Sequence, residues 1–234
     1  MQSTLGEFQE TQSEQPFALQ NSKLLKVSLD QVTIQAQAGS MVAYQGDVAF
    51  EHAGSGGLSR MVKKAVTGEG TKLMKMSGTG EVFLAHTAQE IHLLYLENDA
   101  ITVNGENLLA FDAGIDWDIR RVEGVSGFMG GGLFNMALTG TGWVAVVSDG
   151  PPVLLNTGEA PTFADPQAAI TWASSVKTGI KTDIKLKNLI GRGSGESVQM
   201  SFSGPGWVLV QPSEGRVSAA SSGGGGGLLS NLTS

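Results

Sequence analysis

The stretch "MSFSGPGWVLVQPSE" at residues 200–214 has two close relatives earlier in the chain, and together the three copies decide the fold. The earlier copies are "MALTGTGWVAVVSDG" at 136–150 and "MKMSGTGEVFLAHTA" at 74–88. In each copy a methionine stands four residues before a Gly-x-Gly, and apolar residues then alternate with a period of two. This period is typical of a β-strand, and the glycines supply the positive φ angles of a tight hairpin or a bulge.

The similarity continues upstream of each Gly-x-Gly. The segments 41–51, 108–118 and 162–173 share an apolar-x-aromatic pair, at Val48/Phe50, Ile115/Trp117 and Ile170/Trp172. A glycine-rich element lies between this pair and the Gly-x-Gly in each copy. One small antiparallel unit cannot bury its apolar face alone, so we expect three copies to pack about a pseudo-threefold axis around a common core. The tryptophans are expected to pack in that core.

The predicted fold class is therefore all-β, a double-stranded β-helix or antiparallel β-sandwich built from three internal repeats. A flexible N-terminus is expected over 1–15 and a glycine-rich flexible tail over 216–234. A single β-domain is expected between them, over 16–215. Its three repeats are placed at 24–98, 99–155 and 156–215.

Composition excludes several classes of function. The chain has 234 residues and no cysteine, which rules out disulfides and thiolate metal sites. The formal net charge of −7 argues against a nucleic-acid partner, because such binding needs a basic surface. The sequence shows neither a secretory signal nor an apolar run of bilayer length. A cytoplasmic location is the resulting expectation.

Three polar residues are the candidate metal ligands. Glu90 and His92 stand two apart and would share one face of a strand, with His86 nearby. The spacing differs from the usual cluster of cupin enzymes, so ordinary strand residues are the favoured interpretation. No cofactor is expected. No nucleophile elbow or tuned carboxylate pair appears, which predicts that the chain is not an enzyme.

Two segments are candidates for partner contact. A short helix is predicted near residues 57–66, with Arg60, Lys63 and Lys64 away from its apolar face. Such a helix either closes the end of a β-core, the favoured reading, or docks on a partner or an anionic membrane. The tail is read first as disordered; the alternative is that Leu228, Leu229 and Leu232 contact a neighbouring chain.

The stretches "GSMVAYQGDVAFE", "GGLSRMVKKAVTGEG" and "SGTGEVFLA" resemble the mitochondrial biogenesis family named for altered inheritance of mitochondria, a family of unknown function. The resemblance covers roughly residues 17–212. It implies a double-stranded β-helix similar to that of the tryptophan RNA-binding attenuator, and an association of fungal members with mitochondrial inner-membrane organisation. It implies no catalytic residue.

These observations predict a non-enzymatic β-scaffold that acts through contacts with an unknown protein partner. A homo-oligomer is expected. Contact with a membrane surface is a further expectation, by a protein that does not itself span the membrane. The alternative is a small-ligand or metal-binding module that uses a pocket of the β-helix.

Overall fold

The computed structural model describes residues 3–30, 32–52, 73–121, 134–182 and 198–213. These residues form one 3-10 helix and antiparallel strands, which confirms the all-β prediction. The predicted helix at 57–66 and the candidate contact residues Arg60, Lys63, Lys64, Leu228, Leu229 and Leu232 lie outside the described residues. The elements are η1 (Leu5–Phe8), β1 (Phe17–Asn21), β2 (Leu24–Ser28), β3 (Ile34–Gln37), β4 (Met41–His52), β5 (Leu73–Leu84), β6 (Glu90–Asn104), β7 (Leu108–Asp112), β8 (Asp116–Arg121), β9 (Phe134–Ser148), β10 (Val153–Asn156), β11 (Thr162–Ala164), β12 (Ala169–Ala173), β13 (Lys177–Thr182), β14 (Val198–Ser203) and β15 (Trp207–Val210).

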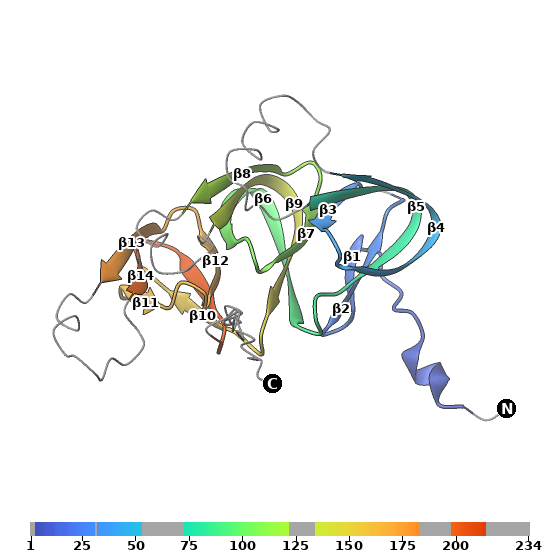
Figure 1. Ribbon diagram of the computed structural model, residues 1–234, viewed down its shortest axis with the longest axis horizontal. Helices are drawn as coiled ribbons and strands as arrows, with labels where there is room; N and C mark the ends of the chain where they lie inside the picture. The colour runs from blue at the N-terminus through green and yellow to red at the C-terminus, as the bar shows by residue number, and fades with distance from the viewer. Residues whose placement is uncertain (1–2, 31, 53–72, 122–133, 183–197, 214–234) are drawn as a thin grey trace, which may run out of the picture.

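Most strands belong to one large sheet, in the order β1-β2-β5-β3-β7-β9-β6-β12-β15-β10. Strand β4 joins it by pairing with β5, and β8 joins it by pairing with β9. A second sheet has the order β11-β14-β13. Figure 1 shows β4 and β5 at one end of the molecule, β6 to β9 in the middle, and β11, β13 and β14 at the other end. The segments that contain the sequence repeats therefore follow one another in a row.

The strand register aligns the three copies residue by residue. The valine that follows each Gly-x-Gly lies opposite an aromatic residue, in the pairs Tyr44↔Val82, Phe111↔Val144 and Trp172↔Val208. The backbone N–H three residues after each valine donates to the turn before the aromatic strand, from Ala85 to Ser40 (2.8 Å), Val147 to Asn107 (2.8 Å) and Gln211 to Ala168 (2.9 Å). The same local geometry thus occurs in all three segments.

This register corrects the alignment of the third copy. Trp172 occupies the position of Tyr44 and Phe111, whereas the sequence comparison placed it with Phe50 and Trp117. Phe50 lies opposite Met76, and the corresponding position of the third copy is Thr178, opposite Phe202. Alternation has a period of two, so a pattern alone cannot distinguish two alignments that differ by an even number of residues.

The Gly-x-Gly pairs do not form hairpin turns. Gly78 and Gly80 lie inside β5, and the equivalent pairs lie inside β9 and between β14 and β15. All six glycines have positive φ angles, between +93° and +148°. A Cβ atom on Gly80 would stand 2.1 Å from the backbone oxygen of Gln45. On one side, β5 changes its partner at these glycines, from β3 before them to β2 after them. On its other side it stays paired with β4 throughout.

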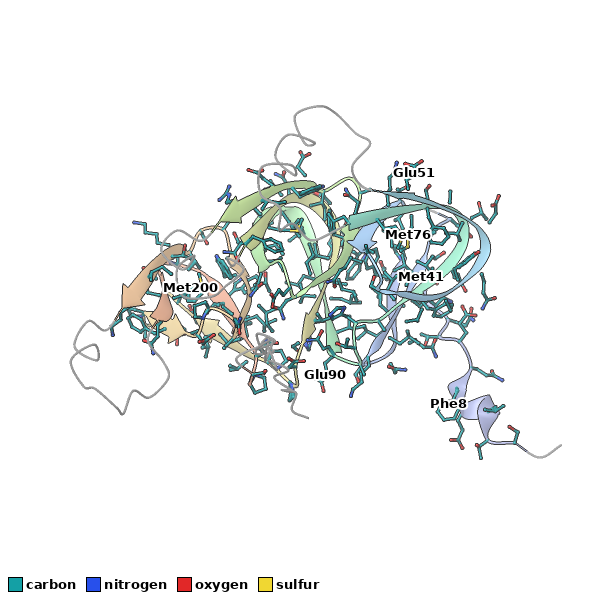
Figure 2. The ribbon with its side chains drawn as sticks, viewed as in Figure 1. Phe8, Met41, Glu51, Met76, Glu90 and Met200 are labelled. Atoms are coloured by element: carbon teal, nitrogen blue, oxygen red, sulfur yellow. The ribbon has the colours of Figure 1, made fainter. Side chains whose placement is uncertain are left out.

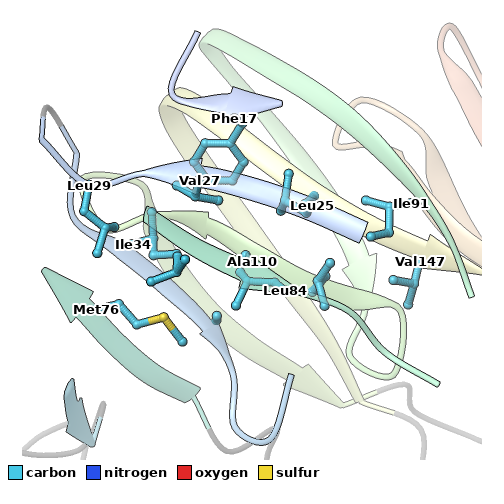
Figure 3. Packing of buried hydrophobic residues seen from close by; sticks show 14 residues of the cluster. Phe17, Leu25, Val27, Leu29, Ile34, Met76, Leu84, Ile91, Ala110 and Val147 are labelled. Carbon is cyan, nitrogen blue, oxygen red and sulfur yellow. The ribbon is translucent and has the colours of Figure 1, made fainter. Parts of the chain in front are cut away.

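The buried side chains divide into three hydrophobic clusters, roughly one for each segment. Figure 3 shows the first, in which Phe17, Val27 and Met76 pack between β1, β2, β3 and β5. The second surrounds Phe111 and Leu138, and the third surrounds Phe202. The expectation of one common core is wrong, because the described residues form three separate clusters, and the first two also contain side chains from neighbouring segments. Trp172 is buried in the third cluster, and the other three tryptophans are partly buried against the first and second.

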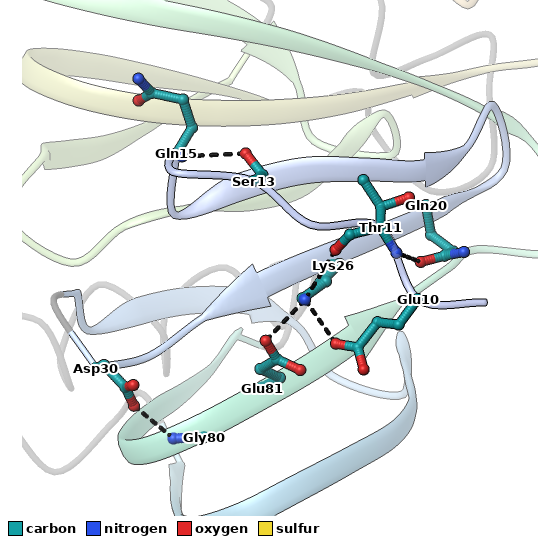
Figure 4. A network of polar contacts seen from close by, with 9 residues as sticks. All are labelled: Glu10, Thr11, Ser13, Gln15, Gln20, Lys26, Asp30, Gly80 and Glu81. Carbon is teal, nitrogen blue, oxygen red and sulfur yellow. Dashed lines mark hydrogen bonds and ion pairs between the residues drawn. The ribbon is translucent and has the colours of Figure 1, made fainter.

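The segment before β1 is attached to the sheet by a buried lysine (Figure 4). The Lys26 ammonium contacts Glu10 (2.5 Å) and Glu81 (2.7 Å) and donates to the carbonyl of Thr11 (3.0 Å). All three of its donors are therefore used. Burial alone would lower the pKa of Lys26, but its hydrogen bonds to the two carboxylates outweigh burial and raise that pKa. Beyond this attachment η1 extends away from the body, with Phe8 exposed on it (Figure 2).

We predict that Gly80→Ala lowers the free energy of unfolding by about 2–5 kcal/mol, because the methyl group meets a backbone oxygen and the φ of +148° strains any other residue. Urea denaturation of the purified chain measures this. Gly114→Ala is the matched control, since a Cβ atom there has nothing within 4 Å and its φ is not positive. Equal losses in the two variants would contradict the interpretation.

Candidate functional site: a polar pocket and two open sheet edges

The three candidate metal ligands are not brought together. His86 lies in the turn between β5 and β6, whereas Glu90 and His92 lie in β6. Among the residues that the structure describes, no group of three His, Cys, Asp or Glu side chains could hold a metal ion. The sequence proximity of these residues therefore does not correspond to a common site.

His92 makes a specific hydrogen bond. Its Nε2 lies 2.7 Å from the hydroxyl of Ser148, and that hydroxyl donates to the carbonyl of Gly150 at 2.7 Å. A hydroxyl has one proton to donate, so Nε2 carries the proton and donates to Ser148. Burial lowers the pKa of His92, partly opposed by the charge of Glu90. The imidazole is thus held neutral, in a single tautomer.

His86 contributes to a polar pocket of about 180 Å³ where the ends of several strands meet. The pocket is lined mostly by amides and acids: Gln37, His86, Thr87, Gln89, Glu106, Asn107, Asp149, Gln167 and Gln211. The side-chain oxygens of two lining residues, Gln37 and Gln89, are buried without a hydrogen-bond partner. The lining contains two acids, Glu106 and Asp149, and no lysine or arginine.

Gln211 holds the wall of this pocket together. Its oxygen accepts from the backbone N–H of Asp149 (3.0 Å) and from the amide of Asn107 (3.4 Å), and its nitrogen donates to the carbonyl of Gln167 (3.0 Å). One buried amide thereby joins the turns that follow β6 and β9 to the loop that precedes β12.

The sequence analysis did not identify Gln211 or its partners as pocket residues. The only signal was a polar residue directly after the apolar strand 207–210.

Strand β4 forms an open edge at one end of the molecule. Among the described strands it pairs with β5 alone, whereas the equivalent strands β7 and β12 are paired on both sides. Phe111 and Trp172 are accordingly 0% and 4% exposed, while the equivalent Tyr44 is 50% exposed. Val42 and Phe50 are also exposed, and the Phe50 ring packs edge-on against Tyr44 at 5.2 Å between ring centroids.

The opposite end of the molecule has a second open edge, formed by β10 and β11. Within the described part of the chain β10 pairs only with β15, and β11 only with β14. Val153 and Leu154 on β10 and Phe163 on β11 are exposed. Lys181 lies over the Phe163 ring, 4.7 Å from its centroid. Exposed large apolar side chains thus concentrate on strands with unpaired backbone groups, which the sequence did not reveal because alternation looks the same in edge and central strands.

We predict that Gln211→Ala lowers the free energy of unfolding by about 2–3 kcal/mol, because it leaves the Asp149 N–H and the Gln167 carbonyl without their partner. The measurement is chemical denaturation at neutral pH. The control is Gln20→Ala, which removes two hydrogen bonds at a less buried position, against three for Gln211. A Gln211 variant no less stable than the Gln20 variant would show that the amide bridge is dispensable.

We predict that His92 makes the protein less stable at mildly acidic pH. Because its folded pKa lies below the ordinary 6.5, the unfolded chain takes up the proton first as the pH falls. The contribution of neutral His92 to the free energy of unfolding is therefore complete above about pH 6.5, and it is lost as the pH falls through the pKa of the folded state. His92→Gln keeps an N–H donor for Ser148 and should give a shallower decline of stability between about pH 7 and 5. Parallel declines in the two proteins would disprove this role.

The comparisons with known proteins agree with this fold. A crystal structure of a protein from Streptococcus pyogenes is similar over 83% of this chain and 91% of that chain, with a TM-score of 0.66 and 22% sequence identity. At that identity the likeness shows the fold alone. No curated protein matches the sequence. No helix in the described part of the chain is long and apolar enough to cross a membrane. The model of the family described as mitochondrial biogenesis AIM24 matches residues 17–213, and the chain belongs to this family.

Proposed function

We propose that the protein is a non-enzymatic β-scaffold that acts through protein contacts at its two open sheet edges. The family is named for mitochondrial biogenesis, and that name specifies no mechanism. The observation that carries the proposal is the exposure of large apolar side chains on β4, β10 and β11, each of which pairs on one side only among the described strands.

The physical argument concerns how proteins treat such edges. An open edge presents N–H and C=O groups to any extended segment, and proteins usually protect it with lysine, proline or a very short strand. Strand β4 has twelve residues, contains neither lysine nor proline, and is exposed over nearly its whole length. Main-chain hydrogen bonds give affinity in strand addition, while side-chain contacts give specificity. The exposed Val42, Tyr44 and Phe50 would supply those contacts on this strand.

A second candidate function is the binding of a small ligand in the polar pocket. It is supported by the polar lining, in which five amide side chains can donate to and accept from a ligand. Glu106 and Asp149 would favour a positively charged ligand. Water is the competing occupant, since a polar cavity of this size accommodates it.

The location of the scaffold is also a proposal. We propose a cytoplasmic or membrane-proximal position; the basic segment 57–66, which lies outside the described residues, is the sequence feature that would contact an anionic membrane.

We predict that the immobilised full chain retains specific polypeptides through its edges. Tyr44→Lys should reduce their retention at least tenfold, because a charge would replace the central apolar contact of β4. The experiment is capture from a lysate, followed by binding of each purified candidate to wild-type and variant chains. Thr139→Lys is the control, since Thr139 is exposed on β9 but its strand is paired on both sides. If no purified polypeptide, including a second copy, distinguishes Tyr44→Lys from Thr139→Lys, the proposed function fails.

A further inference from the structure

Consecutive copies inside the chain are joined by one type of strand pairing. Strand β3 pairs with β7, with Gln35 opposite Phe111, and the middle of β6 pairs with β12, with Thr102 opposite Trp172. Both junctions are antiparallel, and both place an aromatic residue at their centre. Each has one additional backbone hydrogen bond at its end, from Ala113 to Thr33 (2.8 Å) and from Ser174 to Ala100 (3.1 Å).

The third copy contains an equivalent of β3, strand β11, which has no partner on its outer side among the described strands. The residue directly after the methionine of each repeat identifies the equivalent positions. These residues are Lys75, Ala137 and Ser201, and they lie opposite Gln35, Thr102 and Phe163 respectively. Phe163 is therefore the third-copy equivalent of Gln35 and Thr102. Tyr44 is likewise the first-copy equivalent of Phe111 and Trp172. The described part of the chain thus presents two unpaired halves of the same junction.

We propose that these two halves pair between molecules: the β11 edge of one copy joins the β4 edge of a second copy, with Phe163 opposite Tyr44. The internal junctions then place Thr162 opposite Gln45 and Ala164 opposite Ala43. This inference rests on the proposed function, for which it names the partner and the register.

The chemistry of the two edges suits this pairing. An aromatic pair at directly opposite positions stabilises an antiparallel junction, and here both rings are about half exposed in the single chain, 50% for Tyr44 and 48% for Phe163. The additional hydrogen bond of the internal junctions is also available. Pro161 is the equivalent of the acceptors Thr33 and Ala100. Gly46 is the equivalent of the donors Ala113 and Ser174. Pro161 lacks an N–H, but the additional bond at this position requires only its carbonyl.

The resulting contact is head-to-tail. Each copy carries one β4 edge and one β11 edge, and the two surfaces differ, so association builds either a closed ring or an open chain of copies. A symmetric dimer through β4 alone would leave β11 unpaired and is a different arrangement.

The test uses the full chain and three lysine variants, with molar mass measured by light scattering after gel filtration across a range of concentrations. Wild type and the control Thr139→Lys should form species at least twice the monomer mass. Tyr44→Lys and Phe163→Lys should each be monomeric, because each retains only one intact edge. An equimolar mixture of these two monomers should form a 1:1 dimer, since the β11 edge of the first and the β4 edge of the second are both intact.

Other outcomes would overturn the inference. Self-association of Phe163→Lys alone would indicate a symmetric contact through β4. A wild-type monomer at every concentration would also overturn it. In that case, protection of the β4 amides in hydrogen exchange would show that a segment of the same chain covers the edge. If the wild type is monomeric but binds foreign polypeptides in a Tyr44-dependent way, the proposed function survives and the head-to-tail contact fails.

Discussion

The positive φ angles at the three glycine pairs are the constraint on which the rest of this structure depends. At Gly78 and Gly80 the space that a Cβ atom would need is occupied by the carbonyl oxygens of Asp47 and Gln45, at 2.2 and 2.1 Å. Glycine alone tolerates both this contact and the positive φ angles. As a result, β4 and β5 stay paired through this region, and one strand reaches two different partners on its other side. The unit is compact because the strand bends without breaking its ladder.

Repeating such a unit in a row has a consequence at the ends. A strand in the middle of the array finds a partner from the neighbouring copy, and its aromatic side chain becomes buried, as with Phe111 and Trp172. The first and last copies have no such neighbour in the described chain. The same residue position in the first copy, Tyr44, is therefore exposed, and its backbone keeps unpaired donors and acceptors. The exposed edge follows from the architecture and needs no separate element.

Polar residues gather where strands of different copies end close together. Turns leave backbone groups that no strand pairs, and side-chain amides such as those of Asn107 and Gln211 satisfy them. The result is a pocket lined by polar side chains. His92 lies outside the lining of this pocket and is fixed by Ser148. The polar groups of this region thus serve two purposes: Gln211 and Asn107 connect the copies, and other amides and acids line the cavity.

The sequence alone determined the all-β class, the three Gly-x-Gly segments and the family, because glycine at positive φ and a period of two are local properties that residues display directly. It could not align Trp172 with Tyr44 and Phe111, because alternation is unchanged by a shift of an even number of residues. It also grouped His86, Glu90 and His92, which are near in sequence but separate in the structure. The pocket and the open edges were decided only by the tertiary structure. Their residues come from distant parts of the chain, and whether a strand is paired on one side or two depends on which neighbour the fold places beside it.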